Sequence, residues 1–214
     1  MGFERVYFVN GTACAGKSTL VKALAEKYGG ILCGENYHDA LLPELDPAEF
    51  PCLCWSRDLA DWHDFVRRTP EEYEAWIIGV TKECEILELR ILPDLAEQGR
   101  PVFVDTNISP ETLRRITDED HVLIMLADPE ISVRRFFARE DRDKQFLYRL
   151  LLEEPDPEAA LANFRECLRR VNSRENYEGF LRSGFPVLLR DESRTPARTL
   201  ALAEEIFALR EAGA

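Results

Sequence analysis

The sequence has no long apolar run and little basic charge. No stretch approaches the ~18 consecutive apolar residues that a membrane-spanning helix needs. Acidic residues outnumber basic ones by 40 to 27, which gives a formal net charge of −13. This balance disfavours a general attraction to nucleic-acid phosphates or anionic lipid. We therefore expect neither membranes nor nucleic acid as partners, although an anionic small molecule can bind where basic residues cluster.

The amino-terminal residues also lack the features of a secretion signal. They show no basic segment, apolar segment and small-residue cleavage site of the kind that directs secretion. Without an export signal, the six cysteines are expected to be reduced thiols rather than a disulfide framework. Cys52 and Cys54 form a C-x-C pair, but no second pair with a nearby histidine completes a zinc set. We expect a cytoplasmic protein without structural zinc.

Short apolar runs alternate with segments of helical periodicity along the chain. The predicted strands are residues 6–10, 30–33, 102–104, 122–127 and 186–189. The main predicted helices are residues 18–28, 57–68, 70–98, 158–182 and 196–212, with an arginine-rich helix after Asp128 and Pro129. Residues 34–55 are expected to be mostly loop.

This alternation predicts an α/β fold, a three-layer sandwich in which helices cover both faces of a five-stranded parallel sheet. In such a sheet, ligands bind beyond the carboxyl ends of the strands. The loops after the predicted strands would then open onto one shared cleft. No low-complexity linker divides the sequence, so we expect a single domain over residues 1–214.

One short motif carries the most specific chemical signal. Residues 11–18, GTACAGKS, fit the pattern G-x-x-x-x-G-K-[ST] between a predicted strand and a predicted helix. In such a loop, backbone N–H groups and the positive end of the helix dipole point at a phosphate chain. Lys17 is expected to reach the β- and γ-phosphates, and the Ser18 hydroxyl to bind magnesium. The predicted nucleotide contacts are Gly11, Thr12, Ala13, Cys14, Ala15, Gly16, Lys17, Ser18 and Thr19.

Other motifs narrow the class of nucleotide-binding protein. A GTPase would need D-x-x-G after the third strand and N-K-x-D for guanine, but Asp105 is followed by Thr106 and Asn107, and no N-K-x-D occurs. The sequence resembles the nucleoside and nucleotide kinase branch of the P-loop kinases in GTACAGKSTL, LADPEISVRRFFARED and RDESRT. The resemblance implies an ATP- and magnesium-dependent phosphotransferase that acts on a nucleotide, a nucleoside or a similar small acceptor.

The resemblance also implies a helical lid over residues 134–156 that folds over ATP. Arginines of such a lid stabilise the charge that develops on the transferred phosphoryl group. Arg135, Arg139 and Arg142 are spaced i, i+4 and i+7, so they would share one face of a continuous helix. The alternative is an ion-paired surface helix in which the arginines pair with neighbouring acids.

Three carboxylates are candidates to bind the metal or to take the proton of the acceptor. Asp105 matches the acid that holds the magnesium water shell in the resembled family, and its alternative role is a helix cap. Glu35 matches the carboxylate that accepts the proton of the attacking hydroxyl in deoxynucleoside kinases. Asp39 competes with Glu35 for that role, and either one can instead be a solvated loop acid. We leave the choice between them open.

Residues 34–100 would form a helical insertion that covers the acceptor in the resembled family. Arg57, Arg67 and Arg68 are candidates to bind an acceptor phosphate, whereas the spacing of Trp62 favours a core position. A phosphorylated acceptor would need one or more of these arginines, and a hydroxyl acceptor would need Glu35 instead. In the same family the loop after the last strand, here residues 190–195, lies against adenine.

Two rival functions fit the same nucleotide motif. One is a kinase of a non-nucleotide hydroxyl metabolite, and the other is a regulatory protein that hydrolyses ATP slowly. The lid-like arginines and the acids after the second strand favour a kinase over a regulator. The sequence leaves the acceptor and the oligomeric state open.

Overall fold

An all-parallel sheet of five strands forms the centre of the computed structural model, which describes residues 2–138 and 142–209. The strands are β1 (Val6–Gly11), β2 (Ile31–Cys33), β3 (Val102–Asp105), β4 (Val122–Leu126) and β5 (Val187–Leu189). Their order across the sheet is β2-β3-β1-β4-β5. The predicted α/β class and the parallel sheet are confirmed, and the arrangement is compatible with a P-loop NTPase fold.

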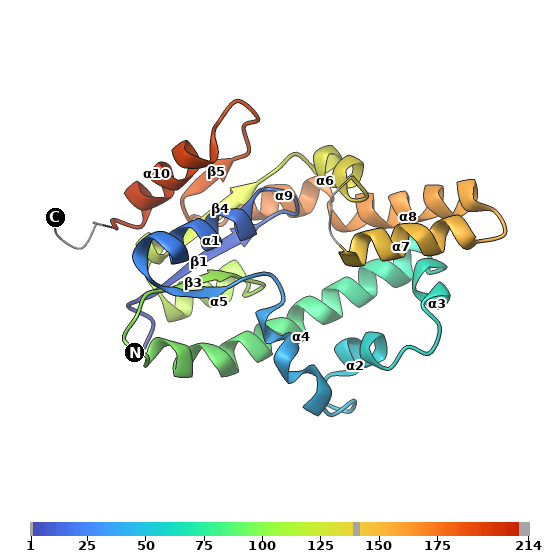
Figure 1. The fold of residues 1–214 in the computed structure, drawn as a ribbon, viewed down its shortest axis with the longest axis horizontal. Helices are drawn as coiled ribbons and strands as arrows, with labels where there is room; N and C mark the ends of the chain where they lie inside the picture. Colours follow the sequence, from blue (N-terminus) through green and yellow to red (C-terminus); the bar gives the residue numbers. More distant parts are fainter. Residues whose placement is uncertain (1, 139–141, 210–214) are drawn as a thin grey trace.

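Helices cover both faces of the sheet (Figure 1). On one face, α1 (Lys17–Tyr28) and α10 (Pro196–Ile206) pack against the apolar side chains of β1, β3 and β4. On the other face lie the end of α4 (Pro70–Ala96), α5 (Pro110–Ile116) and α9 (Arg174–Leu181). All residues of β3 and β4 are buried, so burial of apolar surface on both faces holds the sheet in place.

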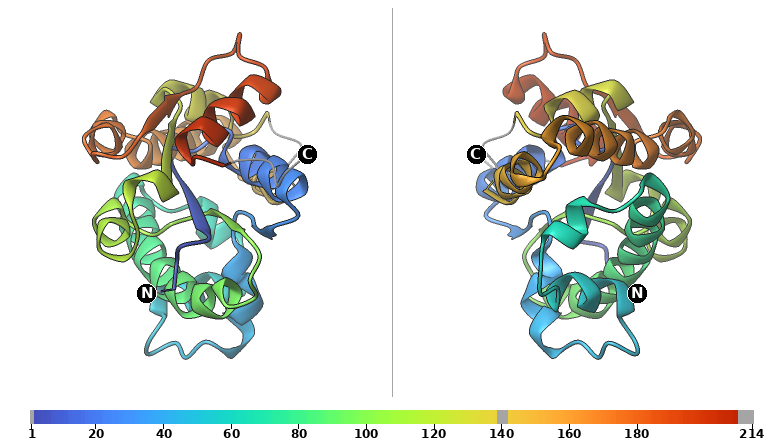
Figure 2. Two further views of the ribbon diagram at one scale, coloured as in Figure 1. Left: turned by 90° about the vertical axis from the view of Figure 1, so that its left-hand side faces the viewer. Right: turned by 90° about the vertical axis from the view of Figure 1, so that its right-hand side faces the viewer.

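Residues 34–100 leave the sheet and form a second layer of helices, at the bottom of both views in Figure 2, opposite α10. The segment contains η1 (Tyr37–Glu44), α2 (Pro51–Arg57), α3 (His63–Val66) and the 27-residue α4. Together with α7 (Arg142–Glu153) and α8 (Pro157–Val171), it encloses an aromatic-rich core around Phe65, Tyr73 and Phe164. The remaining short elements are α6 (Pro129–Arg135) and η2 (Glu119–His121).

Within the described ranges, no helix combines the length and apolar character that crossing a membrane requires. All six cysteines are free thiols.

The start of α4 follows the local signals of the sequence. The Thr69 hydroxyl accepts a hydrogen bond from the Glu72 N–H at 3.2 Å, and the Glu72 carboxylate accepts one from the Thr69 N–H at 2.9 Å. Pro70 occupies the first helical position, where its missing N–H has no cost. This capping box confirms the predicted helix start.

Two predicted helices are interrupted by side chains that bond to the backbone. The helix predicted at 57–68 is wrong: α2 ends at Arg57, and the Asp61 carboxylate accepts a hydrogen bond from the His63 N–H at 2.9 Å, which starts a new turn. The helix predicted at 158–182 divides into α8 and α9, because the Ser173 hydroxyl caps the Asn176 N–H at 3.3 Å. The structure also places η1 and most of α2 in the 34–55 segment expected as loop.

The arginine-rich segment after β4 differs from the predicted continuous helix. α6 ends at Arg135 and α7 begins at Arg142, while Arg139 lies outside the described residues. Between the two helices, the rings of Phe136 and Phe137 turn inward onto Phe164, with ring centroids 5.9 and 5.8 Å apart. The prediction that Arg135 and Arg142 share one helix face is therefore wrong.

Removal of the Thr69 hydroxyl tests the α4 cap. We expect Thr69→Ala to lower the free energy of unfolding by about 1 kcal/mol, because the Glu72 N–H loses its partner. For a chain of this length, that corresponds to a fall in Tm of about 2–4 °C, measured by circular dichroism. Thr69→Ser, which keeps the hydroxyl, serves as the control, and an unchanged Tm in Thr69→Ala would contradict the role of the cap.

Candidate functional site

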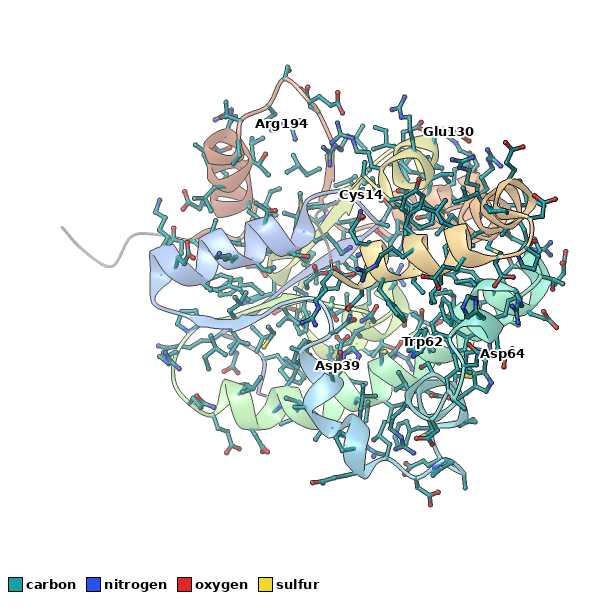
Figure 3. All side chains as sticks on the ribbon, turned by 45° about the vertical axis from the view of Figure 1, so that its right-hand side comes forward. Cys14, Asp39, Trp62, Asp64, Glu130 and Arg194 are labelled. Atoms are coloured by element: carbon teal, nitrogen blue, oxygen red, sulfur yellow. The ribbon has the colours of Figure 1, made fainter. Side chains whose placement is uncertain are left out.

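The 11–18 loop joins the carboxyl end of β1 to the first turn of α1, and in Figure 3 Cys14 marks it between the Arg194 loop and Asp39. Gly11 and Gly16 have φ angles of 128° and 99°, and Cys14 has a φ angle of 60°. A Cβ atom on Gly11 would lie 1.9 Å from the Met125 carbonyl oxygen. The loop thus passes so close to β4 that only glycine fits at its first position.

Neighbouring elements hold the outer side of this loop. The Thr12 N–H donates to the Met125 carbonyl at 3.0 Å, and the Ala127 N–H donates to the Thr12 hydroxyl at 2.7 Å. The Ser132 hydroxyl on α6 donates to the Ala13 carbonyl at 2.8 Å. Three residues therefore hold the loop in place: Met125 on β4, and Ala127 and Ser132 after it.

The backbone N–H groups in the middle of the loop differ from the loop's carbonyl groups in their hydrogen-bond partners. Within residues 2–138 and 142–209, the N–H groups of residues 13–16 donate to no protein acceptor. The Cys14 carbonyl, in contrast, accepts a hydrogen bond from the Arg190 guanidinium. Successive N–H groups without protein partners, next to the amino end of α1, are an arrangement that binds anions.

Asp105 ends β3 directly opposite the start of α1. The Ser18 hydroxyl donates to Asp105 Oδ2 at 2.7 Å, and Lys17 Nζ lies 3.7 Å from Asp105 Oδ1. Lys17 Nζ also donates to the Thr12 carbonyl at 3.3 Å. Burial raises the pKa of Asp105; Lys17 and the Ser18 hydroxyl oppose this shift, and Glu35 adds to it.

Ser18 and Asp105 offer two adjacent oxygen ligands of the type that magnesium prefers. In the part of the chain that the structure describes, no group of three His, Cys, Asp or Glu side chains could hold a metal ion. A magnesium ion at Ser18 and Asp105 would thus take its other ligands from water and phosphate, which is its usual coordination at nucleotide sites.

The two acids predicted for the acceptor side, Glu35 and Asp39, follow β2. Glu35 follows β2 and is close enough to Asp105 to raise the pKa of that carboxyl. Asp39 lies on η1, with Oδ1 3.7 Å from His38 Nε2. Burial, together with the carboxylate of Asp143 on α7, raises the pKa of Asp39.

Two of the arginines predicted for the acceptor have structural partners. Arg57 donates to the Leu42 and Leu45 carbonyls at 2.8 and 2.9 Å and pairs with its neighbour Asp58, so it fixes the end of η1. Arg67 on the α3 side pairs with Glu154 after α7 at 2.9 Å. Neither of these contacts involves the 11–18 loop.

Arg68 lies in an aromatic environment. Its guanidinium carbon is 3.5 Å from the centroid of the Trp55 ring and 5.3 Å from that of Trp76, distances typical of cation–π contacts. Its Nη1 atom is buried without a hydrogen-bond partner among the described residues. Trp62 packs into the helical core beside Phe65, at 5.4 Å between centroids, as its spacing predicts.

A cavity of about 480 Å³ separates the start of α1 from the 190–195 loop. Arg135, Arg190 and Arg194 line it, and Arg135 pairs with Glu192 at 2.7 Å. Its volume lies within the usual range for small-molecule sites. The 190–195 loop and the 11–18 loop therefore border the same cavity, whereas Arg142 lies exposed at the start of α7.

Sequence reasoning missed a buried carboxylate, Glu88. This α4 residue is 0% exposed and accepts hydrogen bonds from Thr106 and Asn107, directly after Asp105. A signal for it exists in the sequence: Leu87 and Leu92 belong to the core-facing stripe of α4, and Glu88 lies on that same side. An acid within an apolar stripe indicates a buried polar contact.

The chain matches no protein-family model, and no curated protein matches its sequence. Its geometry defines the class: an α/β protein with a five-stranded parallel sheet, in which a glycine loop, a lysine, a serine and an aspartate lie together at the strand ends.

Gly11 tests the close approach of the loop to β4. We expect Gly11→Ala to lower the free energy of unfolding by about 1–3 kcal/mol, because its methyl group would overlap the Met125 carbonyl. Urea unfolding measures this change. Gly179→Ala in α9, where a Cβ meets nothing within 4 Å, should be neutral or slightly stabilising. Equal unfolding midpoints for wild type and Gly11→Ala would show that the loop is not packed as described.

Proposed function

We propose that this protein is a P-loop kinase of the nucleoside and nucleotide kinase-like type. It would transfer the γ-phosphoryl group of ATP, with magnesium, to a nucleotide, a nucleoside or a similar small acceptor. The observation that carries the proposal is one juxtaposition: the N–H groups of residues 13–16, which have no protein acceptor among the described residues, lie next to the Ser18–Asp105 contact at 2.7 Å. The first feature suits a phosphate chain, and the second suits its metal ion.

On the donor side, residues 13–16 would bind the phosphate oxygens through their N–H groups. Lys17 would turn from the Thr12 carbonyl, 3.3 Å away, to the β- and γ-phosphates and offset their charge. Ser18 and Asp105 would hold magnesium, which when bound supplies positive charge to the phosphate oxygens. The cavity beside the 190–195 loop would receive the base and the ribose.

On the acceptor side, the acceptor oxygen would attack the γ-phosphorus as the bond to the ADP oxygen breaks. The proton of an attacking hydroxyl would pass to Glu35 or Asp39. The raised pKa of Asp39 makes its carboxylate a stronger base than that of an ordinary aspartate, while the charge of Glu35 acts on Asp105. Both remain candidates.

The arginines distinguish two kinds of acceptor. Arg57 is bonded to backbone carbonyls, and Arg67 is paired with Glu154 at 2.9 Å. A phosphorylated acceptor would have to break such contacts to recruit these side chains. The arrangement thus favours a hydroxyl acceptor over a phosphate acceptor, with Arg68 the remaining cation of the three.

The proposed lid would act through Arg135, Arg139 and Arg142. Arg135 is paired with Glu192 beside the cavity, so it would exchange this carboxylate for a phosphate oxygen on closure. Because Arg135 and Arg142 lie on separate helices, they would approach the phosphates from different directions rather than from one face.

The proposed activity is tested by ADP release from ATP and magnesium across nucleosides, nucleoside monophosphates and small hydroxyl metabolites. We expect at least one acceptor to stimulate release, and Lys17→Ala to reduce the stimulated rate by about 100-fold or more. Lys22→Ala is the matched control, since Lys22 is exposed on α1 and pairs with Glu26. Bound ATP without stimulation by any acceptor would contradict the kinase and favour an ATP-hydrolysing regulator.

The acceptor class is tested by comparing variants with the acceptor that this panel identifies. For a hydroxyl acceptor, either Glu35→Gln or Asp39→Asn should lower kcat by about 10²-fold or more, because proton removal is lost. Arg67→Ala should leave the acceptor KM nearly unchanged, because Arg67 is engaged with Glu154. A large rise in that KM in Arg67→Ala, with normal kcat in both acid variants, would indicate a phosphate acceptor.

A further inference from the structure

The Glu88 carboxylate is the main anchor of the turn that follows Asp105. Its Oε2 accepts a hydrogen bond from the Thr106 hydroxyl at 2.5 Å, and its Oε1 accepts from the Asn107 side-chain amide at 2.8 Å and the Asn107 N–H at 3.0 Å. All of these donors belong to the two residues directly after Asp105. Asp105, whose carboxylate accepts the hydrogen bond from Ser18, thus directly precedes a turn whose polar groups converge on Glu88.

The same carboxylate faces the segment that carries Asp39. His38 Nδ1 lies 3.8 Å from Glu88 Oε1, while His38 Nε2 lies 3.1 Å from Cys84 Sγ and 3.7 Å from Asp39 Oδ1. The His38 side chain is buried, and its Nδ1 has no hydrogen-bond partner in the described part of the chain. Glu88 therefore contacts a neighbour of each of two candidate acids: Thr106, which follows Asp105, and His38, which precedes Asp39.

Glu88 is completely buried although it is an acid. Within the described residues, no lysine or arginine pairs with Glu88; the ring of His38 lies within 4 Å of it, and burial lowers the pKa of that histidine and so favours its neutral form. Burial of a carboxylate without a cation has a large desolvation cost, which raises the pKa of Glu88, while its hydrogen bonds from Thr106 and Asn107 oppose this shift.

Glu83 on the same helix offers a direct comparison. It is also buried, at 7% exposure, and its two oxygens accept hydrogen bonds from the Cys52 and Leu53 N–H groups at 2.9 and 2.7 Å. Both N–H groups belong to the first turn of α2, which begins at Pro51, so Glu83 caps a helix. It is a buried acid of α4 with a structural task, and its bonds do not reach the turn after β3.

We propose that Glu88 is a positioning residue of the phosphoryl-transfer site. From its place on α4, it fixes the turn after Asp105 and the His38–Asp39 segment relative to each other. This inference rests on the proposed function. From the opposite side, Asn10 Nδ2 donates to the Ile108 carbonyl at 2.6 Å, so the turn is held between β1 and α4. With the Glu88 charge removed, the turn would be less firmly fixed, and Asp105 would hold magnesium less well.

The test uses the full chain and two substitutions of equal size, Glu88→Gln and Glu83→Gln. We measure Tm, the affinity for ATP without magnesium, and the magnesium concentration that half-saturates the enhancement of ATP binding. We expect Glu88→Gln to raise that magnesium concentration by about 10- to 100-fold with unchanged metal-free ATP affinity. Glu83→Gln should lower Tm and leave both binding constants at their wild-type values.

Several outcomes would overturn the inference. One is a folded Glu88→Gln protein with the magnesium requirement of the wild type, and another is an equal change in Glu83→Gln. If Glu88→Gln does not fold, Asn107→Ala decides, because it removes the 2.8 Å donor while Glu88 stays: the same magnesium shift is expected, and no shift refutes the inference. A wild type that binds ATP without any effect of magnesium would contradict the proposed function itself.

Discussion

The parallel pairing of β1 between β3 and β4 is the constraint on which the rest of the site depends. Its register places Val9 opposite Asp105 and Gly11 opposite Met125. The glycine loop therefore leaves β1 with an acid on one side and the β4 backbone on the other. Because all of these strands run the same way, their functional side chains meet at one edge although they are far apart in the sequence.

At this edge of the sheet, several acidic side chains lie near one another, and this favours the binding of a cation. Asp105 is buried and near Glu35, Glu88 lies behind it, and Lys17 is the cation within 4 Å of Asp105 among the described residues. Buried carboxylates are stabilised in the charged form by cations and hydrogen bonds. A divalent cation at Ser18 and Asp105 would reduce the repulsion among these acids, so metal binding and the local electrostatics favour the same arrangement.

Local sequence signals predicted the parts of the fold that depend on neighbours in the chain. The strands, the Thr69 cap and the strand–loop–helix context of residues 11–18 all follow from short-range patterns. The breaks at Asp61 and Ser173 were missed because each depends on one side chain bonding to the backbone rather than on periodicity. Glu88 was missed because its partners, some 20 residues further on, become neighbours only when α4 packs against the sheet.

The central claim is that residues 13–18 and Asp105 bind the phosphates and metal of a nucleoside triphosphate. A crystal structure with a non-hydrolysable ATP analogue and Mn²⁺ tests it most directly, since manganese can be located by its anomalous signal. The account predicts phosphate oxygens on the N–H groups of residues 13–16 and a manganese ion bound to the Ser18 hydroxyl, with Asp105 as a direct ligand or one water away. An analogue bound elsewhere, or manganese without contact to either residue, would contradict it.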